Sequence, residues 1–166
     1  MNNIEVDARQ VISMFADLTS RQQRQVYRNA LRKGAGILVG ETKRQLRQAL
    51  GRAASSRNWW NGRTLVSGVK SNADRNGTEA KVHIMGDFRL KFFEMGTRVR
   101  RTTGNNTASV RGRNPIRRQR VSANRGSITA VHFFRTAKAN KEREIFNSMD
   151  NLISQSIQRI ANRNRR

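Results

Sequence analysis

Cysteine is absent from this chain of 166 residues, proline occurs once, and aromatic residues make up only 6% of the sequence. Without cysteine the chain can form no disulfide, thiolate metal site or cysteine nucleophile, which fits a reducing compartment. No apolar run is long enough to span a membrane, and the N-terminal residues lack the charged-then-apolar order of a signal peptide. We therefore expect a protein that is made in the cytoplasm and has no membrane partner.

Acidic residues are also scarce: 11 Asp and Glu stand against 34 Lys and Arg, which gives a net charge of +23. Such an excess does not define a fold, but it predicts self-repulsion and an acidic or polyanionic partner. The charge is densest in residues 98–126, where nine arginines occur without any lysine or acid. These candidate contacts to DNA or to a partner protein are Arg98, Arg100, Arg101, Arg111, Arg113, Arg117, Arg118, Arg120 and Arg125.

The segment 98–126 has two interpretations. A charged loop can simply be solvated, or it can become ordered on a polyanion or on a neighbouring subunit. The arginine density favours the second interpretation. Because guanidinium groups make bidentate contacts with phosphate and carboxylate alike, the composition leaves open which of the two they meet.

Apolar residues at helical spacing predict three helices. The first is a short helix at 8–17, and the second runs from 20 to about 50, with Ser20 as its N-cap and Gln23 in a capping-box position. The third covers residues 136–163. On the long second helix, the face opposite the apolar stripe is basic and carries Arg24, Arg28, Arg32, Lys43 and Arg47.

Four segments are predicted as strands from their alternating or β-branched residues: 64–71, 79–86, 89–97 and 127–134. Asn76-Gly77 predicts a hairpin between the first two strands. The natural arrangement of these elements is an α+β fold. It has an antiparallel sheet of about four strands packed against a long N-terminal helix and a C-terminal helix.

We expect residues 1–166 to form a single domain, with 98–126 as an extended basic loop or arm within it. Several residues are candidates for a subunit interface. Gly34 lies within the long helix, where a glycine can allow close approach of another backbone. Trp59 and Trp60 are adjacent in the following linker, so one of the two is expected to be exposed. Glu94 is expected to pair with an arginine or to accept backbone N–H groups at the turn of Gly96.

Few residues suit catalysis or metal binding. His83 and His132 lie on separate predicted strands, and few carboxylates are available to complete a metal site. Asp87 and Glu94 are the only acids close to both a strand and the basic loop, where a metal-dependent nuclease would need two or three that converge. Phosphate-cradling glycine loops and nucleophile elbows are absent from the sequence. We expect no catalytic residue, no metal and no cofactor.

Four segments occur in an order that is typical of one protein family. They are ALRKGAGILVGETKRQL (30–46), a G-x-x-L-x-x-x-V turn (62–69), FFEMGT (92–97) and the helical segment that follows VHFF (131–160). Together they resemble the tail-completion, or head–tail joining, minor structural proteins of long-tailed bacteriophages. In that family a long helix precedes an antiparallel sheet, and a strand ends in an aromatic–Glu–x–Gly–Thr turn.

The resemblance implies a structural, non-enzymatic protein of the virion neck. Such a protein forms a homo-oligomeric ring, expected to be a hexamer, which contacts other neck and tail proteins while genomic DNA passes through its lumen. An alternative from a different class stays open, namely a basic nucleic-acid-binding module of a ribosome-associated or nucleoid type. The charge supports this alternative, although few aromatic residues lie among the arginines.

Overall fold

The structure is a computed structural model that describes residues 19–57, 63–101 and 124–164. The predicted helix at 8–17 and the two tryptophans, Trp59 and Trp60, lie outside the described residues. In chain order the elements are α2 (Ser20–Leu50), α3 (Arg52–Ser56), η1 (Leu65–Gly68), β1 (Lys70–Ala73), β2 (Ala80–His83), α4 (Arg89–Met95) and α5 (Phe133–Asn164).

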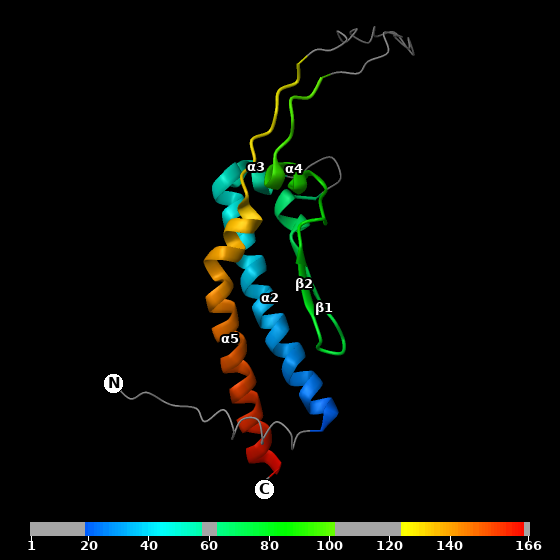
Figure 1. Cartoon of the computed structure of the whole chain (residues 1–166), viewed down its shortest axis with the longest axis vertical. Helices are drawn as coiled ribbons and strands as arrows, with labels where there is room; N and C mark the ends of the chain where they lie inside the picture. The colour runs from blue at the N-terminus through cyan, green and yellow to red at the C-terminus, as the bar shows by residue number, and fades with distance from the viewer. Residues whose placement is uncertain (1–18, 58–62, 102–123, 165–166) are drawn as a thin grey trace, which may run out of the picture.

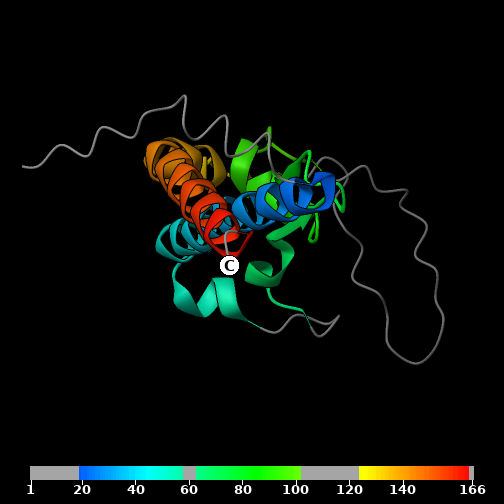
Figure 2. The ribbon, with the colours of Figure 1, turned by 90° about the horizontal axis from the view of Figure 1, so that it is seen from below.

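The two long helices, α2 and α5, lie side by side in opposite directions and form the body of the protein (Figure 1). In the end view of Figure 2 they cross at an angle. The β1–β2 hairpin packs on α2, and the short elements α3, η1 and α4 gather at the C-terminal end of α2. Residues 96–101 and 124–132, which connect to α4 and α5, leave the body at that same end.

The N-cap of α2 lies one residue earlier than we predicted. Thr19, and not Ser20, is the N-cap: its hydroxyl accepts from the backbone N–H of Gln22, and the Gln22 side chain accepts from the backbone N–H of Thr19 at 3.0 Å. This reciprocal arrangement satisfies two N–H groups that a helix start leaves unpaired. The 31 residues of α2 correspond to a length of about 46 Å at 1.5 Å per residue.

The predicted hairpin is confirmed, but it makes the only sheet in the described part of the chain. Strands β1 and β2 are antiparallel, with Lys70 opposite His83 and Ala73 opposite Ala80. Its turn contains Asn76-Gly77, and Gly77 has a φ of 73°. The fold is therefore α+β as expected, with two strands instead of about four.

None of the four predicted strands is present in full. The strand predicted at 79–86 is shortened to β2, and the other three are shortened further or replaced. In 64–71, the Thr64 hydroxyl caps a 3₁₀ turn at Leu65–Gly68, so only the last residues join β1. Residues 127–132 lie outside any named strand, His132 has a φ of 52°, and α5 starts at Phe133, inside the predicted strand 127–134.

The predicted strand 89–97 is largely helix α4. Leu90 is fully buried and Phe93 is half-buried three residues later, which is a helical and not a strand spacing. The aromatic residues of this segment favoured a strand on propensity, but packing of the Leu90 side chain in the core decides the local structure.

The core lies at the end of the body where the short elements meet. It combines residues from α2, η1, α4 and the start of α5. These residues are Leu46, Leu65, Val66, Val69, Leu90 and Phe133, with Val39, Leu50, Ile84, Phe93, Val131 and Phe134 packed against them. The arm therefore starts beside this core.

Away from this core, α2 and α5 approach each other closely at Gly34. Large side chains are also buried along the two helices, among them Val26 of α2 and Ile157 of α5. A Cβ at Gly34 would lie 2.8 Å from Met149 Sδ and 3.1 Å from Ile145 Cγ2. The close approach that Gly34 predicted is therefore made to α5 of the same chain, and its predicted role at a subunit interface stays a prediction.

Replacement of Gly34 and Gly36 by alanine is expected to have opposite effects on stability. Alanine is the better helix former by about 1 kcal/mol, and a Cβ at Gly36 has nothing within 4 Å. Gly36→Ala should therefore raise the free energy of unfolding by about 1 kcal/mol. Gly34→Ala should leave it unchanged or lower it by up to about 2 kcal/mol, because the Met149 and Ile145 side chains must move. Urea unfolding of both variants measures the difference, and equal gains would contradict the packing described here.

Candidate functional site

The root of the arginine arm is a pair of antiparallel segments. The Thr97 N–H donates to the Ile128 carbonyl at 2.9 Å, and the Ile128 N–H donates to the Thr97 hydroxyl at 2.9 Å. One step further out, the Arg100 N–H donates to the Gly126 carbonyl at 3.0 Å and the Arg125 N–H to the Arg100 carbonyl at 2.8 Å. Figure 1 shows the two segments leaving the body together beside α4. The first residues of the predicted loop 98–126 are therefore a paired ribbon.

This ribbon brings together four of the nine arginines that the sequence singled out. Arg98, Arg100, Arg101 and Arg125 are all exposed, and Arg101 forms an antiparallel bridge with Asn124. Segments that are more than 20 residues apart in the sequence thus place their positive charges at one root. The other five lie outside the described residues: Arg111, Arg113, Arg117, Arg118 and Arg120.

The FFEMGT segment makes the turn that aims this ribbon. Gly96 has a φ of 74°, and a Cβ there would lie 2.9 Å from the Ile128 carbonyl oxygen. A side chain at this position would therefore meet both backbone strain and a steric clash. Upstream, the Phe93 carbonyl accepts from the Val131 N–H at 2.8 Å, so the segment after the arm is fixed on both sides of Gly96.

Glu94 connects this turn to the start of α5. Its carboxylate accepts from the backbone N–H of Phe134 at 2.8 Å and from that of Arg135 at 3.1 Å. Of the two roles predicted for Glu94, pairing with an arginine or accepting backbone N–H groups, the structure shows the second. The prediction placed those N–H groups at the turn of Gly96 and not at a helix 40 residues away. A carboxylate is favoured here because the first N–H groups of a helix are unpaired and carry a partial positive charge. The carboxylate is occupied within the chain, and its predicted role at a subunit interface stays a prediction.

An exposed apolar face on α4 lies next to the arm root. Phe88, Phe92 and Met95 occupy positions i, i+4 and i+7, and the Phe88 and Phe92 rings pack edge to face with centroids 6.0 Å apart. Phe88 is 63% exposed, Met95 67% and the neighbouring Met85 60%. We call these four residues the α4 face. Sequence reasoning missed it because the segment was taken as a strand, although the i, i+4, i+7 spacing was a readable signal.

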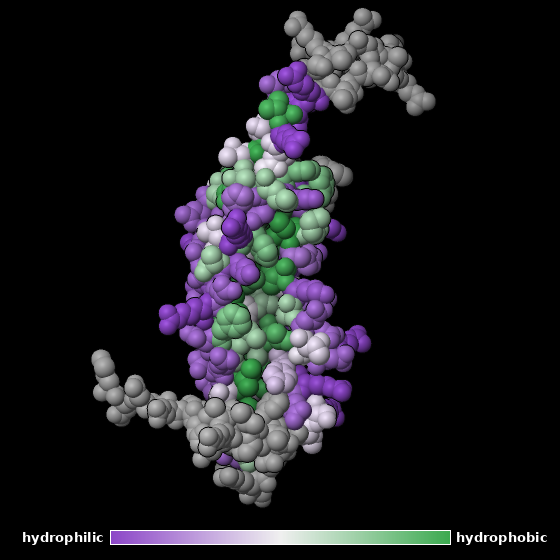
Figure 3. Space-filling model, viewed as in Figure 1, coloured by the Kyte–Doolittle hydropathy of each residue, from purple (hydrophilic) through white to green (hydrophobic). Residues whose placement is uncertain are grey.

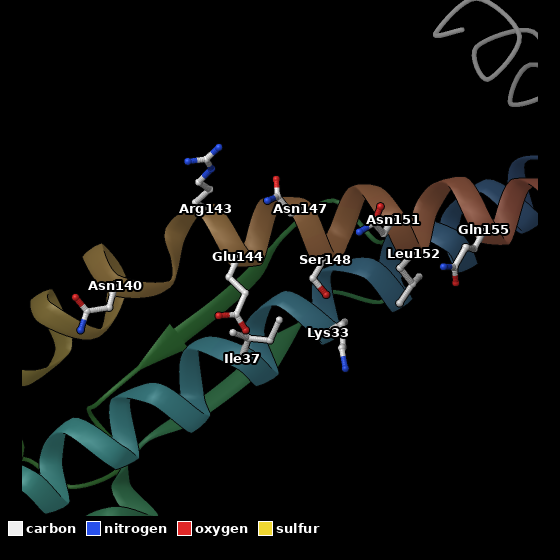
Figure 4. Close-up of a pocket in the computed structure, with 10 residues that line it drawn as sticks. All are labelled: Lys33, Ile37, Asn140, Arg143, Glu144, Asn147, Ser148, Asn151, Leu152 and Gln155. Atoms are coloured by element: carbon white, nitrogen blue, oxygen red, sulfur yellow. The ribbon is translucent and has the colours of Figure 1, made fainter. Parts of the chain in front are cut away.

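A shallow groove follows the line between α2 and α5 (Figure 4). Glu144, Ser148 and Leu152 point from α5 toward α2, where Lys33 and Ile37 complete the lining. The other lining residues are Asn140, Arg143, Asn147, Asn151 and Gln155. The only acid in the lining, Glu144, pairs with Lys141. The groove therefore combines polar and apolar side chains but offers no second acid, histidine or cysteine to work with Glu144.

The residues considered for metal or nuclease chemistry do not converge in the structure. His83 and His132 are both exposed, on β2 and just before α5. Asp87 accepts from the Arg89 N–H at 3.0 Å and from Arg89 Nε at 2.8 Å, while Glu94 holds α5. Across residues 19–57, 63–101 and 124–164, no group of three or more His, Cys, Asp or Glu could hold a metal ion. Over the same residues, no helix is long and apolar enough to cross a membrane.

Two buried carboxylates have lowered pKa values. The pKa of Glu41 falls to about 2, first because the Arg44 side chain donates to it at 2.6 and 2.8 Å, and further because Gln45 Nε2 donates at 2.8 Å. Burial opposes this shift. The pKa of Asp87 is lowered chiefly by its hydrogen bonds from the Arg89 side chain. Both acids are therefore charged at neutral pH and internally paired.

The chain matches no protein-family model, no curated protein and no solved structure. Its function must therefore be argued from its own residues.

Glu94→Ala is expected to lower the free energy of unfolding by about 1–2 kcal/mol, because two N–H groups at the start of α5 lose their acceptor. Glu94→Gln keeps one acceptor oxygen and should cost less. Hydrogen exchange at the amides of Phe134 and Arg135 should accelerate in the alanine variant. Glu142→Ala, an exposed change within α5, is the control and should leave exchange at these amides unaltered. Unchanged exchange in Glu94→Ala would show that Glu94 does not hold the helix.

Acid should destabilise the protein in a range set by Glu41. Because the pKa of Glu41 is about 2 in the folded chain and near 4.3 in an unfolded one, the contribution of Glu41 to stability is present above about pH 4.3. It is lost as the pH falls from there toward 2. Glu41→Gln should be less stable at pH 7 and lose less stability over this interval, as measured by urea unfolding. Glu79→Gln, in an exposed pair with Lys81, is the control and should follow the unmodified chain.

Proposed function

We propose that this chain is a structural protein of a bacteriophage neck. In this proposal it forms a ring, with a hexamer as the expected assembly, which completes the tail and joins it to the head connector while DNA passes through the lumen. The resemblance in sequence order suggests the class. The geometry of the FFEMGT turn gives that motif a physical role, which is to fix the last helix and to direct an arm away from the body.

The observation that carries the proposal is the α4 face beside the arm root. Phe88 and Met95 are large apolar side chains left mostly in water, next to a ribbon of exposed arginines. Aromatic residues, Met and Arg are the types enriched where proteins bind one another. Figure 3 shows further apolar surface along the middle of the molecule, with hydrophilic residues on both sides. A subunit in a ring covers such surfaces with its neighbours, whereas a monomer leaves them exposed.

The charge of the chain limits what the DNA can do in such a ring. Six copies at +23 carry 138 positive charges. A channel about 46 Å long, the length of α2, encloses only about 27 phosphates of duplex DNA. DNA in the lumen therefore neutralises a minority of the charge. In this proposal most of the arginines face acidic surfaces of neighbouring neck and tail proteins.

The alternative, a basic nucleic-acid-binding module, makes a different prediction about assembly. Such a module would work as a monomer and bind duplex DNA or RNA with a steep dependence on salt. The neck proposal instead requires a ring or a concentration-dependent oligomer. Light scattering coupled to gel filtration at 0.3 M salt separates the two, and a monomer at every concentration would contradict the neck proposal.

Loss of the α4 face should weaken self-association. The double variant Phe88→Ser/Met95→Ser is expected to raise the subunit dissociation constant tenfold or more, because truncation of a central interface residue costs about 2 kcal/mol. Phe146→Ser removes another exposed aromatic residue, 58% exposed on α5, and is the matched control. Circular dichroism checks that both variants fold. Equal dissociation constants for all three proteins would exclude the α4 face as the contact.

Particles assembled without this chain test the neck function directly. Filled heads separated from finished tails are the expected products, and overlong tails would instead assign it to tail termination. Normal, infectious particles would contradict any role at the neck.

A further inference from the structure

A row of arginines lies at the end of the body opposite the arm, on the first half of α2. Arg21, Arg24, Arg28 and Arg32 follow one another at intervals of three, four and four residues, so they share one face of the helix. They line a groove, which we call the α2 groove, together with Ser20, Gln25, Asn29 and Arg75. All eight lining residues are polar or cationic, and none is acidic.

Arg75 reaches the α2 groove because the hairpin turn is fixed against the helix. A Cβ at Gly77 would lie 2.7 Å from the Arg24 carbonyl oxygen and 3.1 Å from the Arg28 nitrogen. The turn therefore touches the backbone of α2 between two members of the row. The Gly77 N–H donates to the Asp74 carbonyl at 3.3 Å, which closes the turn that carries Arg75. The fold thus fixes the backbone that carries the fifth arginine.

The cations of the α2 groove are not neutralised by the described part of the chain. None of the four ion pairs found there includes Arg21, Arg24, Arg28, Arg32 or Arg75. The nearest hairpin acids have other partners: the Asp74 carboxylate accepts from the Thr78 hydroxyl at 3.0 Å, and Glu79 pairs with Lys81. In addition, Arg28 Nε is buried and has no hydrogen-bond partner. An unpaired buried donor is costly, so the described part of the chain leaves this guanidinium without full compensation.

We infer that the α2 groove binds the sugar–phosphate backbone of duplex nucleic acid without reading its sequence. Protein interfaces centre on apolar or aromatic anchors, and the lining of the α2 groove has none, whereas interfaces with DNA are polar and strongly positive. Single strands are held by stacking on aromatic rings, which the lining also lacks. Ser20, Gln25 and Asn29 supply the uncharged side-chain contacts that usually accompany arginine at phosphates.

The dimensions of the row fit several successive phosphates. From Arg21 to Arg32 the helix rises about 16 Å. One DNA strand carries a phosphate every 3.4 Å along the axis, so this length faces about five phosphates. The inference does not rest on the neck function, because the α2 groove lies within a single subunit, far from the α4 face.

The test compares two charge-matched double variants of the full chain. Arg24→Gln/Arg32→Gln removes two exposed arginines of the α2 groove, and Arg47→Gln/Arg159→Gln removes two exposed arginines elsewhere. Fluorescence anisotropy measures binding to a 25-base-pair duplex of two unrelated sequences from 0.05 to 0.3 M salt. The slope of log affinity against log salt should become shallower by about 2 in the first variant only. Its affinity should fall roughly tenfold or more at 0.1 M salt for both sequences.

Further variants and competitors distinguish the possible explanations. Arg24→Lys/Arg32→Lys should keep the slope of the unmodified chain, because charge is retained. Equal losses in both glutamine variants would overturn the inference, since general attraction by the net charge would then suffice. Polyglutamate that competes as strongly as duplex of equal charge would also overturn it in favour of an acidic protein partner.

Light scattering on the same samples separates this inference from the neck proposal. An oligomer that persists in Arg24→Gln/Arg32→Gln while the salt slope falls supports the α2 groove as a site distinct from the subunit contact. A monomer with an intact groove effect would contradict the neck proposal alone.

Discussion

The carboxylate of Glu94 makes the contact on which the arrangement of this protein depends. By accepting from Phe134 and Arg135, it joins α4 to the first turn of α5 across 40 residues of sequence. Phe133, immediately before these residues, is buried in the core. The same turn continues through Gly96 into the paired ribbon of the arm. The start of the last helix, the core and the direction of the arm are therefore set by one short segment.

Three of the eight acids in the described residues are held inside the fold. Glu41 is held by Arg44 and Gln45, Asp87 by Arg89, and Glu94 by backbone N–H groups. Each is buried or half-buried, and each partner compensates the cost of removing a charge from water. These acids therefore do little to offset the cations that face the solvent. Surface cations that have few counter-charges within the chain attract anions from outside it. The net charge of +23 therefore predicts acidic or polyanionic partners.

The sequence predicted the elements whose signals are local. The 3.6-residue spacing revealed α2 and α5, and Asn76-Gly77 revealed the hairpin. It failed at α4, where the aromatic residues suggested a strand while the positions of Phe88, Phe92 and Met95 followed a helix. The candidate functional site was harder to predict from the sequence, because the pairing of Arg100 with Gly126 and of Glu94 with Phe134 joins distant segments. Such contacts arise from tertiary packing and leave no periodic signal in either segment. The prediction for Gly34 was partly confirmed. Close approach of another backbone element was predicted there, and the structure shows that this element is α5 of the same chain.

The two ends of the body differ in chemistry, and this difference bears on how the chain could work in an assembly. At one end, exposed arginines stand beside the apolar α4 face, a combination that suits another protein because water leaves the apolar surface when the two surfaces meet. At the other end, the α2 groove combines arginines with amide and hydroxyl groups only, which suits phosphates that stay partly hydrated. Helix α2 separates these ends by about 46 Å, so a single subunit could hold a protein neighbour and a nucleic acid at the same time. Net charge alone would allow either partner at either end. It is the presence or absence of apolar side chains beside the arginines that distinguishes them.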